Sequence, residues 1–485
     1  MKISTITKIE SANTLIIPFI KDDKLEESLV KQAKLAGFEM EELAETFKAG
    51  KKENLIISTP GKKYSRVIFL GLGEKPNSGE VISQCRSLFK SKKSKFKGHI
   101  VVDLKGNADL TEFIANGIAL ASYDIGMLKT REEEESHTFN NGSTFSFWIT
   151  ANQKEKIEGS IEKGLKTAET QMNMMALVDA PSNYKTPQMM ADYIKKSGKE
   201  NGFQVSIFDE KECEKKGFHA LLAVGRGSID RPARMVIMEY KSTKKARKIG
   251  LVGKGVTFDT GGVSLKPGNG MEDMKMDMGG SAAVIGTLEL AAKLKLDVHL
   301  IGIVALTENC IDALAIKPGD VINSYSGKTI EVINTDAEGR LILADAVNYM
   351  ATEYKPDLMI DLATLTGSCI RTLGHKAAGL MTNNDDLATA ISKAAETTGE
   401  KVWRLPLWDD YKSELDSDVA DIKNLGGAYA GATTAGKFIE FFTNKHPNWA
   451  HLDIAGTAFM KSEFSKGGSA TAYGVRMLTE LIASN

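Results

Sequence analysis

Short apolar runs typical of β-strands alternate with helix-forming stretches in the first third of this chain. The strand-like runs cover residues 14–19, 55–58, 65–70, 99–103 and 143–150, and the helical stretches cover residues 25–44 and 109–123. Strands that are separated by helices favour an α/β architecture in which the sheet is largely parallel. The alternation resumes after residue 203, so the same prediction extends to the second half.

The second half repeats this pattern with more small residues. Strand-like runs cover residues 248–253, 298–306, 358–362 and 449–454, and helical stretches cover residues 279–294 and 341–353. Residues 321–333 are typical of a hairpin that turns at Ser326–Gly327. We expect residues 449–454 to form the last strand of the chain.

The length of 485 residues exceeds the usual domain size of about 100–200 residues and suggests two or three domains. Residues 153–178 are polar and lack proline, and they contain many helix-forming residues, so they predict a connecting helix. We therefore expect an N-terminal α/β domain over residues 1–152, with an oligomerisation or regulatory role, and a larger C-terminal domain over residues 179–485. Each is expected to hold a mainly parallel or mixed sheet flanked by helices.

Charge, apolar stretches and cysteine spacing argue against several kinds of partner and cellular location. The 62 basic and 63 acidic side chains give a net charge of −1, which predicts neither a nucleic-acid nor a membrane partner. The longest apolar stretches fall far short of the roughly 20 residues that span a bilayer, and residues 1–20 lack the apolar core of a signal peptide. The four cysteines are scattered without paired spacing. We expect a soluble, reduced, cytoplasmic protein.

Two glycine-rich loops, residues 253–280 and 334–341, carry four acidic residues. These are Asp259, Asp277, Asp336 and Glu338. Both loops follow strand-like segments, where open α/β sheets place their sites. Asp336 and Glu338 are two residues apart, so in an extended segment both side chains would point the same way.

Four carboxylates in one pocket would repel one another, and some would stay protonated, unless cations lay among them. Two divalent ions would balance the four negative charges. Oxygen donors with one nitrogen suit zinc, manganese, magnesium or cobalt, and the sequence does not rank these metals.

Each of these residues also has a simpler interpretation. An aspartate in a glycine-rich loop is usually a turn former or a helix cap, and Lys254 and Lys266 would ordinarily be solvated surface charges. The glycine pairs 261–262 and 279–280 would also suit a phosphate-binding loop, but the chain lacks the P-loop and GxGxxG patterns. Only the joint occurrence of these residues favours a metal site.

The segments "VGKGVTFDTGGVSLKP…MKMDMGG" and "NTDAEGRLILADA" closely resemble the leucyl aminopeptidase (cytosol aminopeptidase) family, in its bacterial type. "NTDAEGRL" is the signature octapeptide of that family and is intact here. The resemblance extends through "DLATLTG" (361–367) and "HLDIAGTA" (451–458), whereas the N-terminal part agrees only in layout.

The resemblance implies two divalent metal ions, Mn²⁺ or Zn²⁺, with Mg²⁺ or Co²⁺ as further options. One ion would be held by Asp259, Asp336 and Glu338, together with the backbone carbonyl of Asp336. The second, more exchangeable ion would be held by Lys254, Asp259, Asp277 and Glu338. Lys254 must be neutral to donate a lone pair, and an adjacent +2 charge favours this by lowering its pKa.

The resemblance also implies the reaction, the release of N-terminal residues from peptides by a hydroxide shared between two metals. The free α-amine of the substrate would bind one metal, which limits cleavage to the first peptide bond. Lys266 and Arg340 would be the catalytic cations. Lys266 would stabilise the oxyanion, and Arg340 would hold a bicarbonate ion that acts as general base.

Substrate contacts follow in the same way. Thr364, Leu365 and Gly367 would contact the substrate backbone, Lys266 and Asp277 would lie beside it, and Met274 and Ala458 would line the pocket for the first side chain. Mammalian members carry Met at the position of Ala458, so the smaller residue widens the pocket and predicts a broad preference for Leu and Met. The resemblance further implies a homohexamer whose active sites face an interior cavity.

Two other functions are compatible with parts of the sequence. A DNA-binding regulatory role would rest on residues 89–97, which contain Lys90, Lys92, Lys93, Lys95 and Lys97. The acidic run Glu132–Glu135 and the neutral total favour a solvated face instead. A metal-dependent phosphoesterase is disfavoured by Lys254 in the ligand set and by the lack of histidine in either loop.

Overall fold

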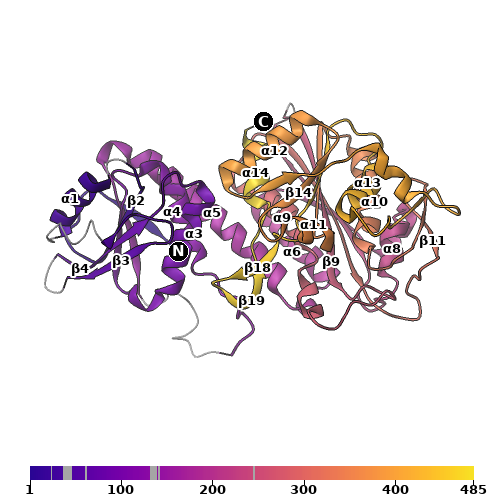
Figure 1. Cartoon of the computed structure of the whole chain (residues 1–485), viewed down its shortest axis with the longest axis horizontal. Helices are drawn as coiled ribbons and strands as arrows, with labels where there is room; N and C mark the ends of the chain where they lie inside the picture. Colours follow the sequence, from indigo (N-terminus) through magenta and orange to yellow (C-terminus); the bar gives the residue numbers. More distant parts are fainter. Residues whose placement is uncertain are drawn as a thin grey trace. The chain divides into compact units, whose positions relative to one another are not determined.

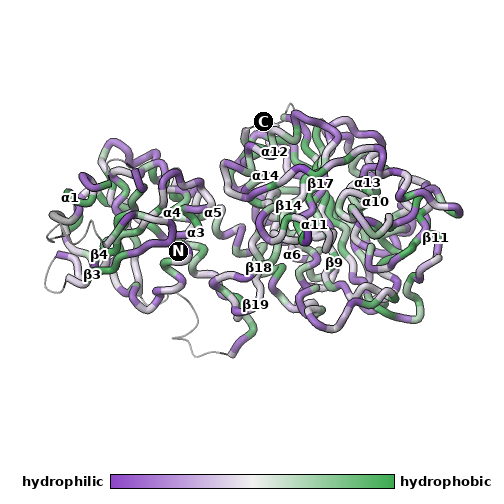
Figure 2. The backbone as a smooth tube through the Cα atoms, viewed as in Figure 1, coloured by the Kyte–Doolittle hydropathy of each residue, from purple (hydrophilic) through white to green (hydrophobic). Residues whose placement is uncertain are grey.

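The computed structural model describes residues 1–22, 25–36, 46–59, 63–130, 139, 142–243 and 246–484. The chain forms two compact α/β units (Figure 1). Met1–Met172 with Glu463–Lys466 make the first unit, and Asn173–Ser462 with Gly467–Asn485 make the second. In Figure 2 the hydrophobic segments gather in the interior of each unit, and hydrophilic segments dominate the outer helices and loops.

The N-terminal unit contains a six-stranded sheet in the order β1-β6-β5-β2-β4-β3. Its strands are β1 (Ile3–Ile6), β2 (Ala12–Phe19), β3 (Asn54–Ser58), β4 (Tyr64–Gly71), β5 (His99–Asp103) and β6 (Thr144–Trp148). All neighbours are parallel except β3 and β4. The unit also contains helices α1 (Leu25–Ala36), α3 (Ser78–Ser91) and α4 (Thr111–Leu120), and α5 (Lys154–Asp179) passes from it into the second unit. Strand β2 is apolar throughout its centre because it is buried on both faces.

The strands expected in the first half are all present, and β1 was not predicted. The helix expected over residues 25–44 is described as far as Ala36, and its remainder lies outside the described residues. The acidic run 132–135 also lies outside them. The lysine-rich run 89–97 ends α3 and forms a 3₁₀ turn, with the Phe89 and Phe96 rings stacked 4.4 Å apart in the core.

The C-terminal unit contains an eight-stranded sheet in the order β15-β14-β17-β13-β9-β10-β8-β7. Its strands are β7 (Gln204–Phe208), β8 (Arg234–Lys241), β9 (Lys248–Asp259), β10 (His299–Asn309), β13 (Leu358–Ala363), β14 (Ala378–Thr382), β15 (Val402–Arg404) and β17 (Trp449–Asp453). The central strands β10, β9, β13 and β17 are parallel, and antiparallel neighbours begin at β8 and β14.

Several expectations for the second half need correction. Strands β7, β8, β14 and β15 were not predicted, and 449–454 is not the last strand. A hairpin follows it, made of β18 (Phe459–Ser462) and β19 (Ser465–Ala470).

The helix expected at 341–353 is α10 (Glu338–Tyr349), which starts three residues earlier and passes into a π-helical turn, Met350–Tyr354. The expected hairpin is present as β11 (Val321–Asn323) and β12 (Thr329–Glu331), which pairs further with β16 (Ile422–Lys423).

Two glycines allow helix α9 (Gly279–Leu294) to lie against the central strands. A Cβ atom added at Gly280 would collide with the backbone carbonyl of Leu362 on β13, and one at Gly253 on β9 would lie 2.8 Å from the Gly280 oxygen. Because these contacts involve backbone atoms, side-chain rotation cannot relieve them. The close approach therefore fixes the position of the helix start beside the ends of β9 and β13.

None of the helices in the described part of the chain combines the length and the apolar character that crossing a membrane requires.

The glycine contacts lead to a stability prediction. Replacing Gly280 with Ala should lower the free energy of unfolding of the C-terminal unit by about 1–3 kcal/mol, since the helix must move away from β13. The matched control is Gly159→Ala in α5, where an added Cβ meets nothing within 4 Å. That variant should be unchanged or more stable by about 0.5–1 kcal/mol, as alanine favours helices. Thermal and denaturant unfolding of both variants measures the difference, and equal stability would contradict the packing constraint.

Candidate functional site

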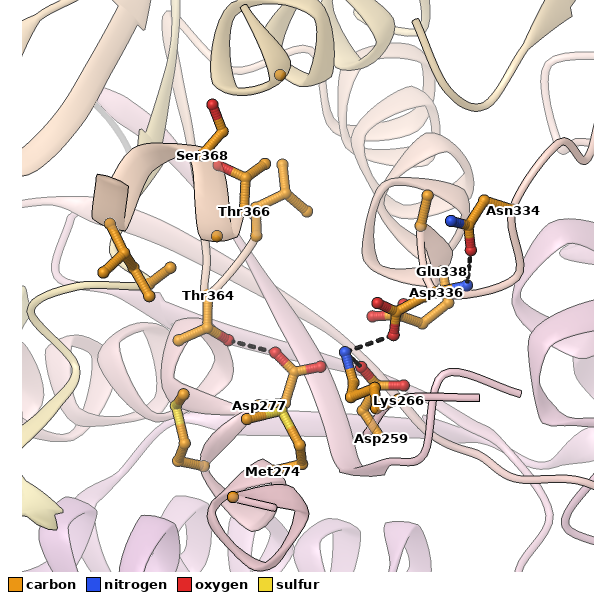
Figure 3. Close-up of a pocket in the computed structure, with 18 of the residues that line it drawn as sticks. Asp259, Lys266, Met274, Asp277, Asn334, Asp336, Glu338, Thr364, Thr366 and Ser368 are labelled. Carbon is orange, nitrogen blue, oxygen red and sulfur yellow. Dashed lines mark hydrogen bonds and ion pairs between the residues drawn. The ribbon is translucent and has the colours of Figure 1, made fainter. Parts of the chain in front are cut away.

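The site lies at the carboxyl ends of the central parallel strands, where open α/β sheets bind ligands. Lys254 and Asp259 belong to β9, and Thr364 directly follows β13. Asp277 lies just before α9, and Glu338 is the first residue of α10. Sheet and helix ends thus deliver their side chains to one cavity of about 530 Å³ (Figure 3).

This cavity gathers nearly all the residues that the sequence singled out. Its lining includes Lys254, Asp259, Lys266, Met274, Asp277, Asp336, Glu338, Arg340, Thr364, Leu365 and Gly367. Ala458 is not among the described residues that line it. It is buried behind the wall, and a Cβ added at Gly279 would lie 2.9 Å from the Ala458 side chain and 3.2 Å from that of Thr364.

A bulge between β9 and β10 brings two key residues of β9 to the same side. Lys254 and Asp259 are an odd number of residues apart, so a regular strand would turn them to opposite faces. The pairing register shifts between Thr307 and Asn309 of β10. Thr307 pairs with Val256 and Asn309 pairs with Asp259, so β9 advances by three residues where β10 advances by two. The extra residue reverses the alternation, and Asp259 then faces the carboxylates that surround Lys254.

Three carboxylates form the centre of the cluster. Asp259, Asp336 and Glu338 each offer an oxygen atom, and these atoms lie within 4.8 Å of one another. The sequence analysis considered an extended segment for Asp336 and Glu338. The structure instead shows a turn that leads into α10. It also follows β12 of the small sheet rather than a strand of the eight-stranded sheet. The two side chains converge because the helix starts there.

Two lysines connect the carboxylates. Lys254 Nζ lies 2.8 Å from both Asp277 Oδ2 and Glu338 Oε1, and it donates a hydrogen bond of 3.0 Å to the carbonyl of Thr364. Lys266 Nζ lies 2.7 Å from Asp259 Oδ2 and also pairs with Asp336 (Figure 3). Asp277 accepts a hydrogen bond of 2.8 Å from the Thr364 hydroxyl. Four carboxylates against two ammonium groups leave a formal charge of −2.

Burial and mutual repulsion shift the pKa values of these groups. Burial raises the pKa of Asp277 to about 6 and that of Glu338 to about 8, and the charge of Asp259 adds to both shifts. Burial lowers the pKa of Lys254, but Asp277, Glu338 and Asp259 outweigh it, so the net shift is upward. Burial lowers the pKa of Arg340 to about 10.

The residues present fit a divalent cation. Glu338 Oε2 is buried and accepts no hydrogen bond from any described residue, and a buried carboxylate oxygen ordinarily has a partner. Oxygen donors of this kind suit hard and borderline metal ions, which would also offset the excess negative charge. Lys254 can join such a ligand set only after it loses its proton, since an ammonium group has no lone pair.

Asn309, which the sequence analysis did not single out, holds the two acidic loops together. Its buried side-chain amide donates to Asp259 Oδ1 at 2.9 Å and to the carbonyl of Thr335 at 3.0 Å. Gly261 N–H donates to the same Asp259 oxygen at 2.8 Å. Neutral donors fix the orientation of Asp259 without cancelling its charge. A polar pair, Glu308–Asn309, at the end of an otherwise apolar strand was the available sequence signal.

Two further residues hold the walls of the cavity. Asn424 accepts a hydrogen bond of 2.8 Å from Ile333 N–H, and its carbonyl accepts one of 2.9 Å from Arg340. Asp453, at the end of β17, is fully buried and accepts bonds from the N–H groups of Leu365 and Thr366 and from the Thr366 hydroxyl. Both act across long sequence separations, and no local sequence pattern predicted either role.

Comparison with known proteins decides the family. The model of the cytosol aminopeptidase family, catalytic domain, matches residues 173–479. The chain belongs to this family. The matched segment contains every strand of the eight-stranded sheet and all the site residues described above.

Individual relatives agree with this assignment. A probable cytosol aminopeptidase of Chloroherpeton thalassium is 44% identical over 440 residues, which cover 86% of each chain. One from Chlorobaculum tepidum is 42% identical over 450 residues, which cover 90% of this chain and 89% of that protein. Among solved structures, the bottromycin maturation enzyme BotP in complex with Mn is 28% identical, with a TM-score of 0.82 over 98% of this chain and 99% of that one.

The expected fold and family are therefore confirmed. The protein is a metal-dependent aminopeptidase, a hydrolase that acts on peptides.

The contacts of Asn309 lead to a prediction for this aminopeptidase. Asn309→Ala removes both side-chain bonds, and loss of such an outer partner typically weakens metal binding by about 10–100-fold. We expect a weaker affinity for Mn²⁺ and a proportionate rise in the metal concentration needed for half-maximal activity. Direct titration of bound Mn²⁺ by electron paramagnetic resonance measures the first quantity, independently of turnover.

The matched control is Asn348→Ala. Asn348 is also a buried asparagine, but it only donates to the Phe442 carbonyl, at 2.9 Å. Both variants should lose some thermal stability, and only Asn309→Ala should bind Mn²⁺ more weakly. Unchanged Mn²⁺ affinity in Asn309→Ala would show that the amide supports the fold alone.

Proposed function

We propose that this aminopeptidase releases single N-terminal residues, with a preference for Leu and other apolar residues such as Met, at a centre of two divalent metal ions. The ligands are Asp259, Asp336 and Glu338 for one ion, and Lys254, Asp259, Asp277 and Glu338 for the other. The observation that carries the proposal is the cluster of three carboxylates within 4.8 Å, in which Asp259 and Glu338 are buried and Asp336 is partly exposed, with too little positive charge around it.

Manganese is the metal that we favour, with zinc as the alternative. The relative BotP is described in complex with Mn, and oxygen-rich ligand sets suit Mn²⁺. When bound, a pair of divalent ions lowers the pKa of a shared water and polarises the peptide carbonyl. The protein side chains described below provide binding, orientation and fixed charge.

Lys266 supplies a cation at the mouth of the site. Burial lowers its pKa, but Asp259, Glu338 and Asp336 outweigh this effect and raise the pKa, so the group stays charged. Its side chain keeps 20% of its surface exposed, which lets it reach a substrate. A fixed ammonium group beside the scissile carbonyl stabilises the oxyanion that develops on cleavage.

Arg340 supplies a second cation, deeper in the site. Its guanidinium donates to the Asn424 carbonyl, while its buried Nε has no hydrogen-bond partner among the described residues. A guanidinium with free N–H groups binds a planar anion in a two-point manner. We propose that Arg340 holds a bicarbonate ion in this way, in the position of a general base.

The walls of the cavity select the substrate. Asp453 fixes the loop of Thr364 and Leu365, whose backbone, with that of Gly367, contacts the peptide in our proposal. Apolar side chains also line the cavity, namely Met271, Met274, Met276, Ile370 and Leu425. Ala458 leaves room behind this wall. A pocket of this kind separates side chains by only about 1–3 kcal/mol per methylene, which favours a broad apolar preference.

The test of the proposal is metal removal combined with blocked substrates. Chelation should abolish hydrolysis of leucine p-nitroanilide, and Mn²⁺ or Zn²⁺ should restore it, because the carboxylates need cations to bind substrate productively. N-acetylated peptides should stay intact while the same free-amine peptides are shortened from the N-terminus. Full activity in protein shown by elemental analysis to be metal-free would sink the proposal.

The two lysines allow a sharper prediction. Lys266→Ala should keep normal metal content and lower kcat by roughly 10²–10³-fold, as expected for one oxyanion-stabilising group. Lys254→Ala should bind the exchangeable metal more weakly and regain part of its activity at high metal concentration. Lys254→Arg should not recover, because a guanidinium stays protonated and cannot donate to a metal.

Metal stoichiometry and kcat across a metal series measure these effects. If Lys266→Ala lost a metal while Lys254→Ala kept both, the roles of the two lysines would have to be exchanged.

A further inference from the structure

The N-terminal sheet contains a topological switch point. Strands β2 and β5 are adjacent and parallel, with Ile16 opposite Val102. The chain leaves β2 for α1, whose Leu29 packs with one face of the sheet, and leaves β5 for α4, whose Ile114 packs with the other face (Figure 1). Neighbouring strands whose helices go to opposite faces leave a crevice at their carboxyl ends, and open α/β sheets bind ligands there.

A cavity of about 600 Å³ opens at this crevice. It is lined by the ends of three parallel strands and by one side of α1. The strands contribute residues 17–20 at the end of β2, Asp103 of β5 and Trp148 of β6. Its volume lies within the range of roughly 300–1,000 Å³ that is usual for small-molecule sites. It lies wholly within the N-terminal unit and shares no described residue with the peptidase site.

Hydrogen-bond acceptors lie at the floor of the cavity. Asp103 is 5% exposed, and it accepts a bond of 3.1 Å from Lys105 N–H and a long contact of 3.5 Å from the Gln32 amide. Burial raises the pKa of Asp103. Gln32 Oε1 is also buried and has no hydrogen-bond partner among the described residues. The Asp103 carboxylate and Gln32 Oε1 can both accept hydrogen bonds from a ligand that carries a donor such as an amine.

Cations and an aromatic surface lie nearby. Lys31 and Lys105 both line the cavity, and Lys105 Nζ lies 3.5 Å from the ring centroid of Trp148. Ammonium groups of this kind bind phosphate as point charges, and an indole offers a flat apolar surface. A ligand that meets all three features carries an anion, a flat body and an amine. The cavity is also much larger than a free amino acid needs.

We propose that the N-terminal unit binds a nucleotide whose base carries a primary amine, in the cavity between the ends of β2 and β5. The amine lies against Asp103 and Gln32, and the phosphate lies near Lys31 and Lys105. This site is separate from the peptidase activity.

The experiment uses AMP as the probe, titrated into the full chain by isothermal calorimetry. AMP should bind at one site per chain. Three comparison ligands each lack one feature: purine riboside monophosphate lacks the amine, adenosine lacks the phosphate, and inorganic phosphate lacks the base. Each should bind at least 10-fold more weakly than AMP. Equal binding of AMP and inorganic phosphate, an absence of AMP binding, or tighter binding of leucine at this site would overturn the proposal.

Variants locate the site. Asp103→Ala and Lys105→Met should each weaken AMP binding by at least 10-fold and leave kcat/KM for leucine p-nitroanilide unchanged. The matched control is Asp109→Ala, whose exposed carboxylate pairs with Lys156 at 2.9 Å outside the cavity; it should bind AMP normally. If Asp103→Ala does not fold, Gln32→Leu takes its place with the same expected loss.

A peptidase-site variant separates this proposal from the proposed function. Lys266→Ala should bind AMP as tightly as the unchanged protein, whatever its effect on turnover. Loss of AMP binding in Lys266→Ala, with normal binding in Asp103→Ala, would place the nucleotide in the peptidase cavity and overturn the proposal.

Discussion

Mutual repulsion among four carboxylates, three buried and one partly exposed, is the constraint around which the catalytic unit is arranged. Asp259 ends β9, Asp277 precedes α9, and Asp336 and Glu338 lie two residues apart at the start of α10. Asp259, Asp277 and Glu338 are buried, so little water is available to screen their charges. Lys254 and Lys266 each bridge two of them and supply half the charge needed. The remaining negative charge attracts divalent cations. The carboxylates that destabilise the cavity by repelling one another therefore favour metal binding.

Two buried amides and one buried carboxylate hold the backbone around the cluster. Asn309, Asn424 and Asp453 lie at the ends of three segments and tie the acidic loops and the substrate loop together. An amide can orient a carboxylate without neutralising it, whereas a further lysine would weaken the attraction for a metal. The lysines therefore lie inside the cavity, the amides of Asn309 and Asn424 support the acidic loops, and Asp453 supports the substrate loop.

Prediction from sequence succeeded where the signal was local. The central strands β9, β10, β13 and β17 read as continuous apolar runs because they are buried on both faces, and the acidic loops carry a family motif. The edge strand β7 was missed because its alternating exposure gives a weak pattern. Asn309 and Asn424 were missed because their bonds to the site span 50 and 84 residues, which no local pattern records. The helical start at Glu338 was missed because the turn before it carries no regular cap.

The bulge in β9 gives the enzyme an unusual sensitivity to chain length. The side chains of Lys254 and Asp259 point to the same carboxylate cluster only because β9 has one more residue than β10 between their matched positions. Removing either Thr257 or Phe258 would restore a regular strand and turn Asp259 away from Asp336 and Glu338. A deletion of a single codon in this stretch would therefore disrupt the site even if every ligand residue were kept. The number of residues in β9 therefore matters to the metal site as much as the identity of the ligands.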